Sequence, residues 1–255
     1  MRKRLLRVLL GIVAIVGVAA GCSPLGATGP MSGPYVKNIW GVDVSSYQHP
    51  RGIAINWGAV HNQGAKFAFI KVSEGGTYTN PYGVADLRAA RAAGLYVGAY
   101  HFGRPRLPLS TATSDARRFA ALIGNVNQPG YLPPVLDLEV TGKLSAANVT
   151  AWARTFLKAL QTASGRVPMI YSGAWFWKGY MGNPKGFARY PLWAAQYTPK
   201  TIGPALFGDF GYSTFWQYTD AGRVSGISAH TAPRLAVAMA ASPRNATLLP
   251  KWSVR

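Results

Sequence analysis

The stretch Pro133-Pro134-Val135-Leu136-Asp137-Leu138-Glu139 places two carboxylates two residues apart at the end of a short apolar run. The run predicts a buried strand over 135–139, and residues i and i+2 of a strand point to the same face. Asp137 and Glu139 should therefore project together. The chain holds only eight acids against 27 Lys and Arg, so two neighbouring carboxylates in apolar surroundings indicate acid/base chemistry.

Short apolar runs alternate with helical patterns on both sides of this stretch, which predicts a mainly parallel sheet wrapped by helices in a single domain. The expected strands cover 39–44, 67–72, 95–101, 135–139, 169–171, 192–196 and 214–218. The expected helices cover 57–63, 81–93, 114–123 and a segment with Val149, Trp152, Phe156 and Leu160 at helical spacing, closed by Gly165. No clear helix separates the last two strands.

Polar residues recur where these strands end. Asp43, Glu74 and His101, like Asp137 and Glu139, lie at or just past the carboxyl end of an expected strand. In (β/α) barrels the active site is built at that face, from the ends of several strands. The sequence therefore predicts one site that gathers these side chains.

Seven segments, in this order, also carry a family resemblance. They are 41–48 (GVDVSSYQ), 67–75 (FAFIKVSEG), 98–102 (GAYHF), 132–139 (LPPVLDLE), 170–173 (IYSG), 191–197 (PLWAAQY) and 216–219 (WQYT). The chain resembles the lysozymes of glycoside hydrolase family 25, the Chalaropsis-type muramidases. The resemblance implies an α/β fold with a single modified TIM-like barrel, five β/α units followed by strands lacking full helices. It also implies hydrolysis of the β-1,4 bond between N-acetylmuramic acid and N-acetylglucosamine in peptidoglycan, with no cofactor.

Carried over to this chain, the resemblance implies that Glu139 is the general acid and then the base. A carboxyl acts as an acid near neutral pH only if burial or a neighbouring negative charge raises its pKa. Asp137 would supply that charge and orient the acetamido group of the substrate, and Asp43 would stabilise positive charge on the sugar. An inverting route, in which Asp43 or Asp137 activates water, stays open.

Substrate contacts are expected from side chains near the strand ends, because aromatic faces pack on sugar rings. These candidates are Glu74, Tyr100, His101, Tyr171, Trp193 and Trp216. Trp175 and Trp177 follow a strand end and are further groove candidates. Arg104 and Arg106 would either meet carboxylates and phosphates of the wall or lie in a solvated loop. The histidines lack metal-ligand spacing, so no metal is predicted.

The resemblance fails near the end of the chain. The segment 225–233 brings Ala232 to the position where family members carry an active-site Asp. The alternative is that Asp220, a few residues upstream, compensates for it. This departure motivates an alternative function, a catalytically weak or inactive barrel that binds cell-wall glycan.

The first residues predict export. A basic start at 1–7 precedes an apolar run over 9–20, which has the length of a signal-peptide core. Val18-Ala19-Ala20-Gly21-Cys22 then resembles a bacterial lipoprotein signal, in which Cys22 carries lipid; the alternative is an uncleaved membrane anchor. Cys22 is the sole cysteine, so the domain holds together without an internal disulfide.

These readings divide the chain into a signal peptide (1–21), a flexible tether (22–36), a muramidase-like barrel (37–240) and a tail (241–255). Without the four basic residues of the leader, 23 Lys and Arg face eight acids, a formal charge of +15. Such a charge favours polyanionic partners or is simply a solvated surface. We expect a monomer, lipid-anchored at the cell envelope, that meets peptidoglycan and anionic wall polymers. No nucleic-acid motif accompanies the charge.

Overall fold

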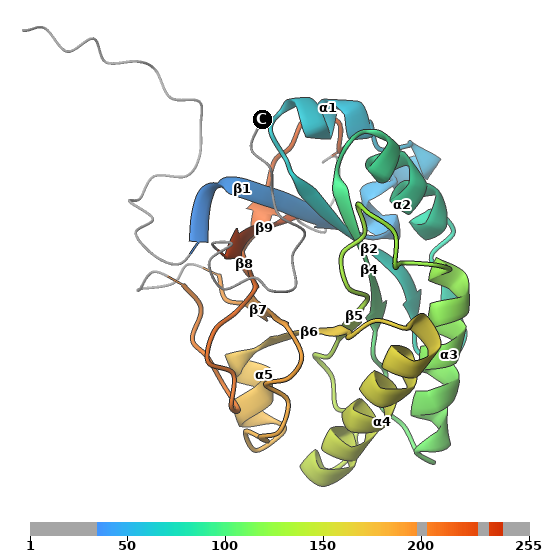
Figure 1. Ribbon diagram of the computed structural model, residues 1–255, viewed down its shortest axis with the longest axis vertical. Helices are drawn as coiled ribbons and strands as arrows, with labels where there is room; N and C mark the ends of the chain where they lie inside the picture. Colours follow the sequence, from blue (N-terminus) through green and yellow to red (C-terminus); the bar gives the residue numbers. More distant parts are fainter. Residues whose placement is uncertain (1–34, 198–202, 229–234, 242–255) are drawn as a thin grey trace, which may run out of the picture. The chain divides into compact units, whose positions relative to one another are not determined.

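The computed structural model describes residues 35–197, 203–228 and 235–241 (Figure 1). The predicted signal peptide, Cys22, Ala232 and residues 242–255 lie outside these ranges. Across the described residues, no helix is both long and apolar enough to cross a membrane.

Strands and helices alternate along most of the described chain. The strands are β1 (Tyr35–Val44), β2 (Phe67–Glu74), β3 (Tyr78–Thr79), β4 (Tyr96–Phe102), β5 (Val135–Asp137), β6 (Met169–Gly173), β7 (Leu192–Ala195), β8 (Phe215–Gly222) and β9 (Leu235–Ala241). The helices are α1 (Trp57–Asn62), α2 (Gly83–Ala92), α3 (Ser110–Ile123), α4 (Ala146–Ser164) and α5 (Ala174–Gly179), with 3-10 turns at Ser46–Gln48 and Pro50–Gly52. A helix follows each of β1, β4, β5 and β6, and α2 follows the β2–β3 hairpin.

The strands form one sheet in the order β1-β9-β8-β7-β6-β5-β4-β2-β3, and β1 also pairs with β2. The pairings from β1 through β2, β4, β5, β6 and β7 to β8 are parallel, whereas β9 runs antiparallel to both β1 and β8. Because β1 pairs with β2 on one side and with β9 on the other, the sheet curls back on itself. The α/β class and the mainly parallel sheet predicted from the sequence are confirmed.

The curl separates two apolar clusters. Leu136 and Leu138 pack among the helices on the outer face, whereas Val135 faces an inner cluster. The inner cluster is mostly aromatic and draws on six strands, β2 and β4 to β8, together with the segment before β5. Its residues are Phe67, Phe69, Tyr100, Leu132, Val135, Met169, Tyr171, Trp193, Ala195 and Phe215. Successive residues of a strand alternate between faces, so Asp137 and Glu139 follow Val135 toward the inside.

Helix α4 forms where the apolar spacing and the closing glycine of the sequence predicted a helix. Ser145 caps its first turn by accepting a hydrogen bond from the Asn148 N–H, and Gly165 ends it with a φ of 68°, in the left-handed region. The predicted apolar positions 149, 152, 156 and 160 are all buried against the outer face of the sheet. In Figure 1, α3 and α4 lie side by side over the strands β4 and β5.

Several elements differ from the sequence-based expectation. Strand β1 begins four residues earlier than predicted, α3 begins four residues earlier, β8 ends four residues later, and the short strand β3 was not predicted. Strand β5 ends at Asp137, two residues earlier than predicted. The aromatic residues around Trp175 form the short helix α5. Strand β9 was missed because its Ala-rich run has low strand propensity, and its pairing with β1 on one side and β8 on the other determines its conformation.

Candidate active site

Asp137 and Glu139 lie at the carboxyl end of β5 and share a hydrogen bond. Asp137 is 5% exposed, and Glu139 is half-buried. Burial, followed by the charge of Glu139, raises the pKa of Asp137 well above its ordinary value. Burial also raises the pKa of Glu139, although the hydrogen bond from Asp137 opposes that rise. The two carboxyls therefore titrate as a pair, and burial raises the pKa of both.

Asp43 projects from β1 toward the same pair. Burial raises its pKa to about 7, the charge of Glu139 adds to the rise, and a hydrogen bond from Gln217 opposes it. The Gln217 Nε2 atom donates to Asp43 Oδ2 at 2.9 Å. Three carboxyl groups from two strands, each with a raised pKa, thus meet in one place.

Phenol groups surround the acids. The hydroxyls of Tyr171 and Tyr197 each donate to Gln217 Oε1 at 2.7 Å. Burial, then the charges of nearby carboxylates, raises the pKa of Tyr100 and of Tyr171 well above the ordinary value. Both rings therefore stay neutral, and the Tyr171 proton is donated to Gln217. The predicted contacts of Tyr100 and Tyr171 with substrate remain predictions.

Trp193 forms the apolar floor beneath these groups. Its ring stacks on Phe69 at 4.2 Å and meets the edges of Tyr100 and Tyr171 at 6.4 and 4.5 Å. The indole is 2% exposed, and its Nε1 atom is buried without a hydrogen-bond partner among the described residues. A role for Trp193 in substrate binding remains a prediction.

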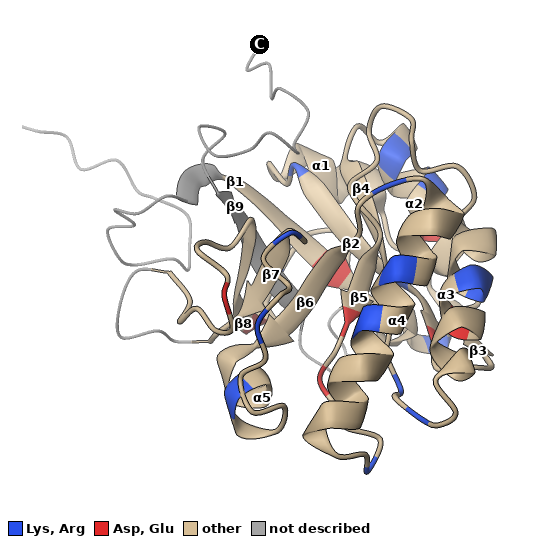
Figure 2. Cartoon of the chain, turned by 60° about the horizontal axis from the view of Figure 1, so that its bottom comes forward, with Lys and Arg blue, Asp and Glu red and all other residues tan. Residues whose placement is uncertain are grey.

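Glu74 stands beside this group at the end of β2. Burial would raise its pKa, but hydrogen bonds and positive charges from Lys71 and Arg104 outweigh that effect and lower it. Arg104 donates to Glu74 from Nε at 2.8 Å and from Nη2 at 2.6 Å, and Lys71 Nζ donates to the other oxygen. Lys71 also lowers the pKa of Asp137 and of Glu139, so its charge acts on Glu74 and on the acid pair alike. Figure 2 shows acidic positions (red) by β5, whereas α4 and α5 carry basic positions (blue).

His101 and Trp216 are not brought into the site. His101 is completely buried on the outer face, between Phe119 and Phe156, and its Nδ1 atom lies 2.9 Å from Ser73 Oγ. Trp216 is 1% exposed and donates from Nε1 to the Gln196 carbonyl oxygen. The expectation that these two side chains contact substrate is wrong, because each follows or precedes an inward-facing residue on its strand and so points the other way.

Of the remaining candidates for substrate binding, Arg106 and Trp177 make structural contacts, whereas Trp175 is exposed. Arg106 makes a two-pronged ion pair with the buried Asp115, at 2.7 and 2.8 Å, and is thereby occupied. Trp177 is completely buried and donates to the Pro184 carbonyl oxygen at 3.0 Å, so it is a core residue. Trp175, which follows β6, is 54% exposed and remains available for substrate.

Sequence reasoning assigned no role to Gln217 or Lys71. Both lie within segments that carry the family resemblance, and each shares a strand face with inner-cluster residues, Gln217 with Phe215 and Lys71 with Phe69. A polar side chain two residues along from a buried aromatic, near a strand's carboxyl end, was the signal that could have identified them.

Asp220 lies on β8 and, after burial and the charges of Asp43 and Glu139, its charge also raises the pKa of Tyr197. The sequence holds no Asp or Glu after Asp220, and the register of β9 sets Ala236 opposite Asp43. Ala232 itself lies outside the described residues. Within the described ranges, no group of three or more His, Cys, Asp and Glu side chains has an arrangement that could hold a metal ion.

Comparison with known sequences places this site in a family. The profile of the glycosyl hydrolases family 25 matches residues 42–227. Lysozyme M1 of Streptomyces globisporus is 34% identical over 200 residues, which cover 75% of this chain and 65% of that protein. The N,O-diacetylmuramidase of Chalaropsis sp. is 34% identical over 194 residues, which cover 72% of this chain and 89% of that protein. The chain thus spans about two thirds of the length of the Streptomyces globisporus relative.

Solved structures give the same result. The bacterial lysozyme from Streptomyces coelicolor superposes with a TM-score of 0.71 at 31% identity, covering 79% of this chain and 91% of that chain. The family GH25 lysozyme from Aspergillus fumigatus superposes with a TM-score of 0.68 at 30% identity, covering 80% and 94%. From its profile match, its relatives and its fold, this chain belongs to glycosyl hydrolases family 25.

Proposed function

We propose that this chain is a muramidase, which hydrolyses the β-1,4 bond between N-acetylmuramic acid and N-acetylglucosamine in peptidoglycan. The observation that carries the proposal is the proton-sharing pair of Asp137 and Glu139 facing a third carboxyl group, Asp43, whose pKa is raised to about 7. Relatives named lysozyme and N,O-diacetylmuramidase support the same reaction.

Glu139 is the proposed acid because it is the more exposed member of the pair. We place the shared proton of the free protein on Asp137, because its Oδ1 atom is buried without a hydrogen-bond partner among the described residues, which disfavours its charged form. An acetamido N–H of the substrate that donated to Asp137 would stabilise its carboxylate form. The proton would then move to Glu139, where it can reach the leaving oxygen.

The substrate-assisted route fits this proton placement. The acetamido carbonyl oxygen forms a bond to the anomeric carbon while the glycosidic bond breaks, and Glu139 gives its proton to the leaving oxygen. Glu139 then takes a proton from the water that opens the cyclic intermediate, which restores the acid pair. Ionised Asp43, oriented by Gln217, stabilises the positive charge that develops on the sugar.

A catalytically weak or inactive glycan-binding barrel is the second candidate. It is favoured by Ala232, which stands where family members are expected to carry an active-site Asp. In that case the three acids and the aromatic floor would hold the glycan without cleaving it.

Digestion of purified peptidoglycan separates the two candidates. Muropeptides ending in reducing N-acetylmuramic acid support the enzyme, whereas binding without release supports the glycan-binding module. Glu139→Gln should slow release by about 10²–10⁴-fold, the usual contribution of a positioned acid. Asp209→Asn, the same chemical change at an exposed acid that binds the N–H groups of Gly186 and Phe187, should leave release unchanged. Equal release by the parent and Glu139→Gln would overturn the assignment.

We further propose export and lipid anchoring through Cys22, supported by the basic and apolar leader and its small residues before the cysteine. The proposed domain division remains 1–21, 22–36, 37–240 and 241–255. The order of strands and helices supports a modified barrel of five β/α units for the third part. Cys22→Ala should release the protein from the membrane fraction, and a variant that stays there would contradict the anchor.

A further inference from the structure

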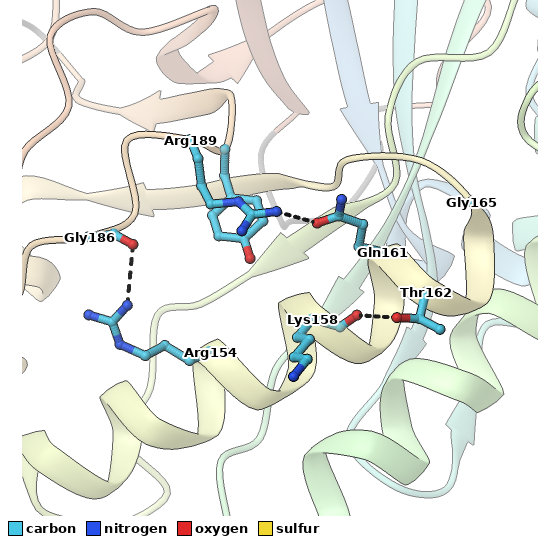
Figure 3. A pocket seen from close by; sticks show the side chains of 8 residues that line it. Arg154, Lys158, Gln161, Thr162, Gly165, Gly186 and Arg189 are labelled. Atoms are coloured by element: carbon cyan, nitrogen blue, oxygen red, sulfur yellow. Dashed lines mark hydrogen bonds between the residues drawn. The ribbon is translucent and has the colours of Figure 1, made fainter.

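A second polar site lies on the outer surface, where the later turns of α4 meet the segment that leads into β7. It is a hollow of about 680 Å³ bordered by the cationic side chains Arg154, Lys158 and Arg189, with Gln161, Gly186 and Tyr190 beside them (Figure 3). We propose that this basic groove binds the phosphate groups of a polyol-phosphate polymer of the cell wall. The identity of the polymer rests on the proposed export and wall substrate of the enzyme.

Two of the cations are held in place by neutral acceptors. Arg154 donates to the carbonyl oxygens of Lys185 at 2.6 Å and Gly186 at 3.2 Å, and its guanidinium lies 4.4 Å from the centre of the Phe187 ring. Arg189 donates to Gln161 Oε1 at 2.8 Å. Neutral partners orient these groups without cancelling their charge, so donors remain for phosphate oxygens.

The third cation has no partner of its own. The Lys158 ammonium makes no hydrogen bond or ion pair with any residue in the described ranges. The dipole of a helix attracts cations only at its last turn, and α4 ends at Ser164. The helix dipole therefore does not explain why cations stand at positions 154 and 158 of α4.

Asp209, which binds the segment 186–187 beside the groove, does not neutralise the charge of the groove. Asp209 accepts hydrogen bonds from the backbone N–H groups of Gly186 at 2.8 Å and Phe187 at 3.2 Å. Among the described residues, it forms no ion pair with Arg154, Lys158 or Arg189. None of the groove-lining side chains is acidic.

The chemistry of the groove favours phosphate over nucleic acid. Single-stranded nucleic acids are held by aromatic rings on which bases stack. The two rings at this groove are not free to do so, because Phe187 is completely buried under Arg154 and Tyr190 is 8% exposed beside Arg189. A flexible chain of polyol phosphates offers repeated anions and needs no stacking surface.

The groove and the acids face opposite ends of the strands. Gln161 lies near the end of α4, which leads into β6, and Arg189 precedes β7, so both lie near the amino ends of their following strands. Asp137 and Glu139 lie at the carboxyl end of β5. A polymer in the groove and a glycan at the acids would therefore not compete, and the groove would keep the enzyme at polymer-bearing wall.

Binding to synthetic poly(glycerol phosphate) tests the proposal, with the full chain kept in nonionic detergent. K158Q/R189Q should weaken binding by about tenfold or more and flatten its salt dependence, since each phosphate contact adds to the salt slope. The matched control is K66Q/R88Q, which removes one Lys and one Arg from exposed positions outside the groove and should change binding by less than about twofold. Thermal melting of both variants checks that they are folded.

Three outcomes would overturn the proposal. Equal losses in the two double variants would show a general effect of net charge. Equal binding of single-stranded DNA, or binding of anionic vesicles in place of the polymer, would show a different partner. Hydrolysis of short soluble glycan strands should be unchanged in K158Q/R189Q, whereas Glu139→Gln should lose hydrolysis and keep polymer binding. The groove and the proposed reaction can therefore fail separately.

Discussion

Gln217 on β8 holds the Asp43 carboxyl on β1, two strands away in the sheet and 174 residues away in sequence, through a hydrogen bond of 2.9 Å from Nε2 to Oδ2. Its Oε1 atom accepts from two tyrosine hydroxyls, so the amide is fixed with its N–H toward the acid. This contact opposes the effect of burial on the pKa of Asp43.

Gln217→Leu should shift the acidic limb of the kcat/KM profile to higher pH. The substitution removes the hydrogen bond that lowers the pKa of Asp43, so the pKa rises above its value of about 7. A hydrogen bond to a charged group contributes about 1.5–3 kcal/mol, which corresponds to about one pH unit or more. Tyr197→Phe keeps the amide in place and should move the limb less; an unmoved limb in Gln217→Leu would contradict a required Asp43 carboxylate.

Lys71→Met should shift the alkaline limb of the same profile to higher pH. The ammonium lowers the pKa of both Asp137 and Glu139, so its loss raises both and keeps the acid protonated over a wider range. Arg104→Gln is the matched control, because Arg104 also binds Glu74 but does not act on the pair. If both variants shift the limb equally, the effect comes through Glu74 and not from Lys71.

The first product released should have the β configuration at its new reducing end. Substrate-assisted hydrolysis proceeds with net retention, whereas direct attack of water activated by Asp43 or Asp137 inverts the anomeric carbon. Proton NMR of a concentrated digestion, recorded before mutarotation, distinguishes the two anomers. An initial α signal would replace the mechanism proposed for the Asp137–Glu139 pair with the inverting one.

His101 should make the domain less stable in acid. Burial lowers its pKa from 6.5 to about 3, so between these values the unfolded chain binds a proton that the folded chain does not. Stability attributable to His101 is complete above pH 6.5 and is lost as the pH falls toward 3, with a limiting slope of about 1.4 kcal/mol per pH unit.

Urea unfolding of the parent and His101→Asn at pH 7, 5.5 and 4.5 measures this effect. The carboxyls with raised pKa values change the free energy of unfolding with pH in the opposite direction, and they do so in both proteins. The difference between the two plots of unfolding free energy against pH therefore isolates the effect of His101. Parallel curves would mean that the pKa of His101 is not lowered in the folded protein.

Much of the site followed from the period of two along strands. The face shared by Asp137 and Glu139 was correct because Leu136 and Leu138 between them pack outward. The same rule, applied strictly, would have excluded His101, since its neighbour Tyr100 points inward. Position at a strand end was the stronger cue in the prediction, but it says nothing about the direction of a side chain.

Other features depended on contacts that no local pattern carries. The two hydroxyls that donate to Gln217 come from two other segments of the chain. The Lys71–Glu74–Arg104 cluster joins β2 to the segment that follows β4. Strand β9 was missed because alanine and methionine also favour helices; only its two neighbours in the sheet determine its conformation.

Strand β9 determines when the proposed hydrolysis can begin. It hydrogen-bonds on one edge to β1, which carries Asp43, and on the other to β8, which carries Gln217. Before β9 docks, these two edges are unpaired and Asp43 has no fixed partner. A chain still emerging from the ribosome, or only partly translocated, should therefore lack activity. Hydrolysis would begin only after residues 235–241 have joined the sheet.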